Sequence, residues 1–206
     1  MGLSFHYNGK ISDPALLPDL IDEVQEIANV HHWKYFIFDR QFIIGDFGKT
    51  GHNQCIYGIC FTPPECETVN ICFLSNGRMS SIVNLQLWAK TTDPAEKDYL
   101  YMNSVKTQFA SVELHQLLIH LFRHLNNKYF ADFNLYDEVS YWETNDEALL
   151  RKNFNRNLAL INSVESALEH IPRNEGEDIE DYLERIIKPI HDKKDEIGDS
   201  SSTPNL

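Results

Sequence analysis

Residues 55–89 constrain the fold most strongly, because this stretch is dense in residue types that favour β-strands. CIYGICFTP and ETVNICFLSNGRMSS are rich in valine, isoleucine, phenylalanine, tyrosine and cysteine, which fit a pleated and half-buried surface. The pair Asn76-Gly77 is the preferred sequence of a two-residue type I′ hairpin turn. The alternating SIVNLQLWAK that follows is then the returning strand. The sequence therefore predicts an antiparallel meander in this part of the chain.

Three other segments repeat apolar residues at steps of three and four, the spacing of an amphipathic helix. They are residues 14–32, 111–130 and 146–171. Capping signals stand at the start of each: Asp13, Ser111 and the Thr144/Glu147 pair. Further strand patterns occur at LSFHYNGKI, WKYFIFD, YLYMNSVKTQF and ADFNLYDE. The expected fold is α+β, an antiparallel sheet of about five to seven strands with these three main helices packed on it.

The composition changes after residue 173. Residues 1–173 are predicted to form one globular domain, in which His31 continues the apolar stripe of the first helix into the core. Residues 174–191 combine helically spaced apolar residues with many acids, which predicts an acidic amphipathic helix ending near Pro189. Residues 192–206 are polar and are expected to be disordered.

The formal net charge of the chain is −13. No stripe of lysine and arginine offsets it, so nucleic acid and anionic membranes are poor partners. Another protein, in particular a basic one, is the better expectation. The apolar residues Phe154, Leu158 and Ile161 on the third helix would also allow a homodimer.

A cytoplasmic location is expected, since the N-terminal residues lack the apolar segment of a signal peptide and no run approaches the roughly 20 apolar residues of a membrane span. Four cysteines, Cys55, Cys60, Cys66 and Cys72, would then remain reduced. Their spacing does not give the paired C-x-x-C of a zinc site. We expect them to be buried free thiols.

His120 and His124 stand one helical turn apart in HLFRH, a spacing at which two histidines can bind one zinc or nickel ion. Asp137 and Glu138, in the acidic segment NLYDEVSYWETND, are the candidate carboxylates that would complete the site. Against a metal, no glutamate follows the first histidine, and Arg123 would repel a dication. We therefore favour an ordinary solvated helix face and expect no cofactor, with a divalent transition metal such as zinc as the alternative.

SVKTQFA (104–110) and YWETND (141–146), separated by one expected helix and one expected strand, resemble a pattern in a group of bacterial proteins of uncharacterised function. The likeness covers roughly residues 100–150, and it implies no activity. It singles out four candidate binding residues: Lys106, Gln108, Trp142 and Glu143. The alternative for all four is structural packing where a strand ends beside a helix cap.

No nucleophile motif such as G-x-S-x-G occurs, and no complete catalytic set is recognisable. We therefore expect a non-enzymatic protein-interaction domain that works in the manner of a chaperone, an adaptor or an immunity factor. The alternative is a metal-dependent hydrolase that uses His120 and His124 with carboxylates of residues 137–143, the metal generating the nucleophile. A small-molecule pocket lined by Trp88 and Trp142 is a third hypothesis, which the sequence does not rank.

Overall fold

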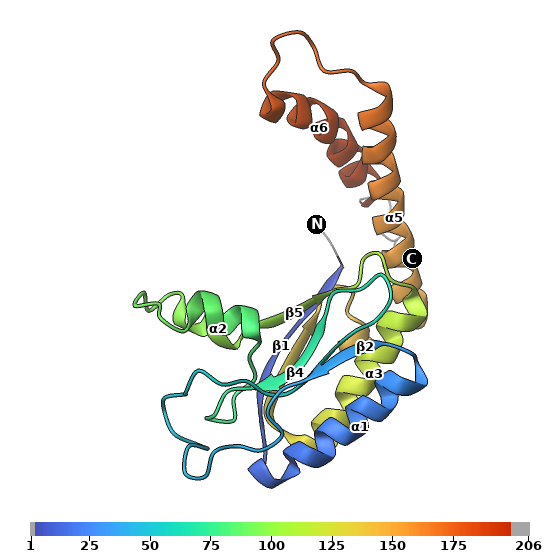
Figure 1. The fold of residues 1–206 in the computed structure, drawn as a ribbon. Helices are drawn as coiled ribbons and strands as arrows, with labels where there is room; N and C mark the ends of the chain where they lie inside the picture. The colour runs from blue at the N-terminus through green and yellow to red at the C-terminus, as the bar shows by residue number, and fades with distance from the viewer. Residues whose placement is uncertain (1–2, 199–206) are drawn as a thin grey trace, which may run out of the picture. The chain divides into compact units, whose positions relative to one another are not determined.

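The computed structural model describes residues 3–198, with side chains described as far as residue 188. The chain divides into two compact units, residues 1–151 and 152–206. The elements of the first unit, drawn in Figure 1, are β1 (Ser4–Ile11), η1 (Pro14–Leu16), α1 (Leu17–Val30), β2 (Lys34–Ile37), β3 (Tyr57–Thr62), β4 (Val69–Phe73), α2 (Ile82–Trp88), η2 (Lys97–Tyr101), β5 (Asn103–Lys106), α3 (Val112–Tyr129), β6 (Phe130–Asp137) and α4 (Tyr141–Thr144). Helix α5 (Glu147–His170) runs from the first unit into the second, which also contains α6 (Ile179–Gly198).

The predicted α+β class is confirmed, but the strands of the described chain form two small sheets instead of one larger sheet. Both are antiparallel and three-stranded, with the orders β5-β1-β6 and β2-β3-β4. The sheets meet where the chain leaves β4, because Met79 N–H donates to the carbonyl of Gly9 on β1 (2.8 Å) and Ser80 N–H donates to that of Cys72 on β4 (3.0 Å). These few residues join the sheets without forming a strand of their own.

SIVNLQLWAK, expected as a returning strand, is helix α2, and this prediction was wrong. The Ser81 side chain accepts a hydrogen bond from Asn84 N–H (3.1 Å), so it caps a helix at the point where the strand was expected to begin. The preceding turn also differs from the type I′ turn, because Gly77 has a positive φ of 83° whereas Asn76 does not. Leu74 N–H donates to the carbonyl of Arg78 (2.9 Å), which closes a three-residue loop.

The core of the first unit lies between the strands and the two long helices. Phe5 and Tyr7 of β1 contact Phe122 of α3, with ring centroids 5.5 Å and 4.6 Å apart. Helices α1 and α3 lie on one side of the strands and α2 on the other (Figure 1). On α1, Glu23 accepts hydrogen bonds from three α3 residues: His124, Lys128 and Tyr129. The half-buried carboxylate of Glu23 thus ties α1 to α3.

Two of the predicted helix starts are confirmed by their caps. The Asp13 side chain accepts from Ala15 N–H (2.8 Å), and the Ser111 side chain accepts from Leu114 N–H (3.1 Å). The third cap was misplaced, because Asp146 rather than Thr144 accepts from the first turn of α5, at Leu149 N–H (3.0 Å). The prediction for His31 was also wrong: the ring is exposed and stacks at 4.8 Å on Trp33, which takes the core position.

In the second unit, α6 continues through Pro189 to Gly198, beyond the residue where we expected it to end. Residues 192–198, expected in a disordered tail, lie within this helix, and residues 199–206 of that tail lie outside the described residues. The proposed boundary at residue 173 remains a prediction.

Candidate functional site

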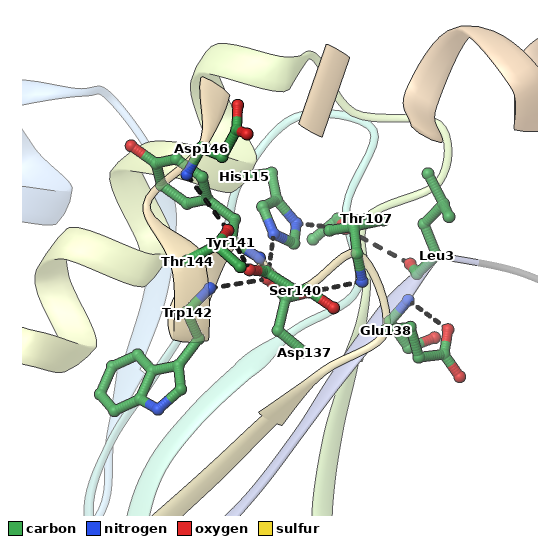
Figure 2. A network of polar contacts seen from close by, with 12 residues as sticks. Leu3, Thr107, His115, Asp137, Glu138, Ser140, Tyr141, Trp142, Thr144 and Asp146 are labelled. Carbon is green, nitrogen blue, oxygen red and sulfur yellow. Dashed lines mark hydrogen bonds and ion pairs between the residues drawn. The ribbon is translucent and has the colours of Figure 1, made fainter. Parts of the chain in front are cut away.

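The connection that follows β6 is held by the buried carboxylate of Asp137. Its Oδ2 accepts hydrogen bonds from the backbone N–H groups of Tyr141 (2.8 Å) and Trp142 (3.1 Å), the first residues of α4. Its Oδ1 accepts one from Val139 N–H (3.1 Å). His115 Nε2 lies 3.2 Å from Oδ2 (Figure 2). Because an ionised carboxylate can only accept, this contact places a hydrogen on Nε2.

The other nitrogen of His115 extends the network to the N-terminal end of β1. Its Nδ1 lies 2.9 Å from Oγ1 of Thr107, just beyond β5. Thr107 N–H donates to the carbonyl of Leu3 (2.8 Å), and its Oγ1 lies 3.3 Å from the same oxygen. Figure 2 shows the imidazole between Thr107 and Asp137. One buried histidine therefore connects five segments: the residue before β1, the end of β5, α3, β6 and α4.

The surroundings keep Asp137 ionised. Burial alone raises the pKa of its carboxyl group, but the hydrogen bond and charge of His115, together with the backbone donors, outweigh burial and hold the pKa below the usual 3.8. A buried carboxylate that accepts several hydrogen bonds is stabilised in its charged form. Asp137 thereby supplies the negative charge that the N-terminus of α4 favours.

Arg123 of α3 holds the opposite end of α4. Its Nη2 donates to the carbonyls of Tyr141 (3.0 Å) and Trp142 (2.9 Å), and its Nη1 donates to the Asn145 side chain (2.7 Å). The residues on either side of α4, Ser140 and Asn145, have left-handed φ values of 59° and 56°, a conformation that costs about 1–2 kcal/mol in a residue with a side chain. The carboxylate and the guanidinium together offset this strain and fix the connection.

Thr107, His115 and Asp137 repeat the hydroxyl, imidazole and carboxylate of a hydrolytic triad. Their exposed fractions are 0%, 0% and 1%, so no substrate reaches the hydroxyl. The buried arrangement joins segments of the fold to one another. His115 is fully buried, and its link to Asp137, 22 residues later, had no signal in the sequence.

The structure does not bring the four predicted metal ligands together. His120 Nε2 lies 3.3 Å from the Tyr141 hydroxyl, whereas His124 bonds to Glu23 on α1. Asp137 is occupied by His115. Glu138 accepts from Ser4 N–H (2.8 Å) and lies 3.6 Å from His6. The described residues contain no group of three or more histidine, cysteine or acidic side chains able to hold a metal ion. The zinc hypothesis therefore remains a prediction without a geometric site.

The four predicted binding residues fall into two pairs. Lys106 N–H donates to the Glu67 side chain (2.9 Å), and Gln108 is half-buried just beyond the same strand. Trp142 and Glu143 lie on α4; the Trp142 indole is half-buried, packs edge-on against Phe133, and Glu143 is exposed. Their roles in binding remain predictions.

The cysteines differ in burial. Cys72 is fully buried, whereas Cys55, Cys60 and Cys66 are half-buried, and all four are free thiols. Burial raises the pKa of the Cys66 thiol to about 12 and raises that of Cys60 as well. Thiols protonated at neutral pH are poor nucleophiles and poor metal ligands, so Cys60 and Cys66 give no sign of a reactive site.

A group of exposed apolar side chains in the first unit lies on α2 and the segment that contacts it. We call it the α2 surface. Five side chains form it, with these exposed fractions: Ile82 40%, Val83 56%, Leu87 63%, Tyr99 45% and Met102 48%. Asn84 Nδ2 donates to the carbonyl of Met102 (2.8 Å), and the rings of Trp88 and Tyr99 lie 5.1 Å apart. These contacts hold α2 against the end of η2.

A small cluster of buried residues packs against the core-facing side of α2. Leu85 of α2 and Leu100 of η2 pack with Ile56, Cys72 and Leu74. The Ser80 hydroxyl donates to the carbonyl of Leu100 (2.7 Å). The apolar side chains of the α2 surface are therefore exposed on a backbone anchored to the core. This exposure was not predicted, because the segment was expected to be the returning strand of the meander.

Comparison of the chain with protein-family models, with curated proteins and with solved structures gave no match. Among the described residues, no helix has the length and apolar character needed to cross a membrane.

Proposed function

We propose that this protein is an acidic, non-enzymatic protein-binding domain, and that the partner binds at the α2 surface. The observation that carries the proposal is the exposure of Ile82, Val83 and Leu87 on a single short helix. Contiguous exposed apolar residues on a folded domain mark protein interaction sites, because their hydration is unfavourable until a partner covers them. Function as an adaptor, a chaperone or an immunity factor fits this surface equally well.

The contacts that hold α2 on the core favour a role in binding and argue against local disorder of this helix. Leu85 faces the core while Val83 and Leu87, two residues before and after it, face solvent. Since the helix is capped by Ser81 and bonded to Met102 through Asn84, the exposed side chains need little ordering when a partner binds. A preorganised surface loses less conformational entropy on association.

Site-specific photo-crosslinking in the native host tests the proposal. A benzophenone amino acid at position 87 should form one saturable crosslink to a partner protein, whereas the same group at the exposed polar position 134 on β6 should not. Val83→Asp should reduce the crosslink yield at position 87 at least about tenfold, since a charge cannot be buried in an apolar interface without a large cost. Equal yields at positions 87 and 134, or no effect of Val83→Asp, would reject the α2 surface as the binding site.

A further inference from the structure

The second unit contains a helical hairpin whose turn is tightly organised. Arg185 of α6 forms two bonds to the Glu177 carboxylate (2.7 Å and 2.9 Å) and donates to the carbonyl of Pro172 (3.1 Å). The Tyr182 hydroxyl donates to the carbonyl of Ile171 (2.8 Å). These contacts fix the start of α6 to the end of α5 through residues 171–178. Figure 1 shows α6 turning back toward α5.

Apolar side chains remain exposed around this turn. Leu168 (45%) and Ile171 (36%) lie at the end of α5, and Ile179 (52%) and Leu183 (38%) lie in the first turns of α6. Tyr182 and Ile186 point to the buried side of α6 instead, with exposed fractions of 9% and 1%. Ile179 and Leu183 are four residues apart and therefore neighbours on one face. We call the four exposed residues the hairpin surface.

The charges around the hairpin surface are almost all negative. Between residues 164 and 184 the only lysine or arginine is Arg173, whereas the acidic residues are Glu165, Glu169, Glu175, Glu177, Asp178, Glu180, Asp181 and Glu184. Glu177 is neutralised by Arg185, which lowers its pKa to about 2. No described side chain forms an ion pair with Glu165, Glu169, Glu180 or Glu184. Carboxylates without an ion-pair partner among the described side chains thus lie close in sequence to the exposed apolar residues of both helices.

We propose that the hairpin surface binds a basic amphipathic helix of another protein, with apolar residues of that helix on Leu168, Ile179 and Leu183 and its lysines or arginines facing Glu180 and Glu184. Exposed apolar residues bordered by acidic ones complement such a helix in two ways: they match its apolar face, and their negative charge matches its positive charge. A second copy of the chain would place like charges opposite one another. The inference rests on the proposed protein-binding function in general but on none of the residues of the α2 surface.

Fluorescence anisotropy with a synthetic probe tests this inference on the full chain. The probe is an 18-residue labelled peptide with leucine at i, i+3, i+4 and i+7 positions and lysine elsewhere. A second peptide with glutamate in place of lysine is its control. We expect micromolar binding of the lysine peptide and none of the glutamate peptide. Ile179→Ser/Leu183→Ser should weaken binding at least about tenfold, and Glu180→Gln/Glu184→Gln should reduce its salt dependence.

Ile43→Ser/Ile44→Ser, in the segment between β2 and β3, is the matched control, because it also removes two exposed apolar side chains but lies outside both proposed surfaces, so it should leave peptide affinity unchanged. Circular dichroism of each variant should match that of the wild-type protein, since all substituted positions are exposed. Failure of the lysine peptide to bind at 100 μM, unchanged affinity in both hairpin variants, or an equal loss in the Ile43→Ser/Ile44→Ser control would overturn the inference. None of these outcomes bears on the crosslink at position 87, so the two proposals fail separately.

Discussion

His115 Nε2 lies 3.2 Å from Oδ2 of Asp137, and both side chains are fully buried between α3 and β6. The Thr107 hydroxyl completes the arrangement, because it can donate either to His115 Nδ1 (2.9 Å) or to the carbonyl of Leu3 (3.3 Å). A neutral imidazole accepts from Thr107 at Nδ1; a protonated one donates to Thr107, which then donates to Leu3. Both His115 Nδ1 and the Thr107 hydroxyl therefore have a hydrogen-bond partner whether the imidazole is neutral or protonated.

Asp137→Asn should lower the free energy of unfolding by about 3 kcal/mol. The amide keeps the shape of the side chain, but its NH₂ group cannot accept from His115 or from the N–H groups of α4, so buried donors lose their partner. Urea denaturation measures the change. Asp132→Asn, on an exposed side chain paired with Lys10, should cost less than about 0.5 kcal/mol. Equal effects of the two substitutions would mean that the buried network does not stabilise the fold.

Glu23 should make stability depend on pH in the acidic range. Partial burial raises the pKa of this carboxyl group, but the bonds from Lys128, Tyr129 and His124 outweigh burial and lower the pKa from 4.5 to about 2. Because the folded-state pKa lies below the unfolded-state value, this stabilisation is present above pH 4.5 and is lost as the pH falls through 2.

Glu23→Gln should accordingly remove about 1 kcal/mol of stability at pH 7 and almost none at pH 2, the modest size reflecting a side chain partly in solvent. Thermal unfolding of both proteins between pH 2 and pH 7 measures this difference. A constant gap between the two curves across the whole range would contradict the assigned ion pair with α3.

Gly58→Ala should prevent normal folding or cost more than about 3 kcal/mol. Gly58 has a φ of +120°, and a Cβ atom at this position would lie 2.3 Å from the carbonyl oxygen of Ile71 on the neighbouring strand. Gly48 offers the matched control, because its φ is +76° and a Cβ there meets no atom within 4 Å. Gly48→Ala should therefore cost only about 1–2 kcal/mol, as chemical denaturation of both variants would show.

His120→Ala/His124→Ala should leave the metal content of the purified, untagged protein unchanged. His124 is bonded to Glu23, and His120 has the Tyr141 hydroxyl as its neighbour, so no described carboxylate joins the two histidines at one point. Plasma mass spectrometry after zinc supplementation checks this. Loss of a stoichiometric metal from the double variant would revive the hydrolase hypothesis.

Local signals predicted much of the fold. The caps at Asp13 and Ser111 and the apolar spacing of α3 are set by residues within one or two turns of each other, so the sequence contains the information. Over only seven residues, the alternation in SIVNLQLWAK did not distinguish a strand from a helix. The Ser81 side chain caps the segment as a helix in the structure. The division of the strands into two sheets depends on the bond from Met79 to Gly9, a contact between segments 70 residues apart that no local pattern encodes.

The candidate sites were less predictable for the same reason. Asp137 was a candidate ligand in the alternative metal hypothesis because carboxylates crowd its segment, whereas its partner in the structure, His115, lies on a different element. The resemblance drew attention to Trp142, and the structure places it on α4, between the Asp137 carboxylate and Arg123. The α2 surface could not be predicted from the sequence. The exposure of Val83 and Leu87 depends on how α2 packs on the cluster of Leu85 and Leu100, and this packing is a property of the tertiary structure.

We propose above all that the α2 surface binds a protein partner. The most direct measurement is the affinity of the partner, once purified through the crosslink at position 87, for wild-type protein and for Val83→Asp/Leu87→Asp. Both substitutions lie on exposed positions, so identical circular dichroism spectra are expected. A loss of affinity of at least about tenfold with an intact fold is the predicted result. Equal affinities for the two proteins would contradict the claim.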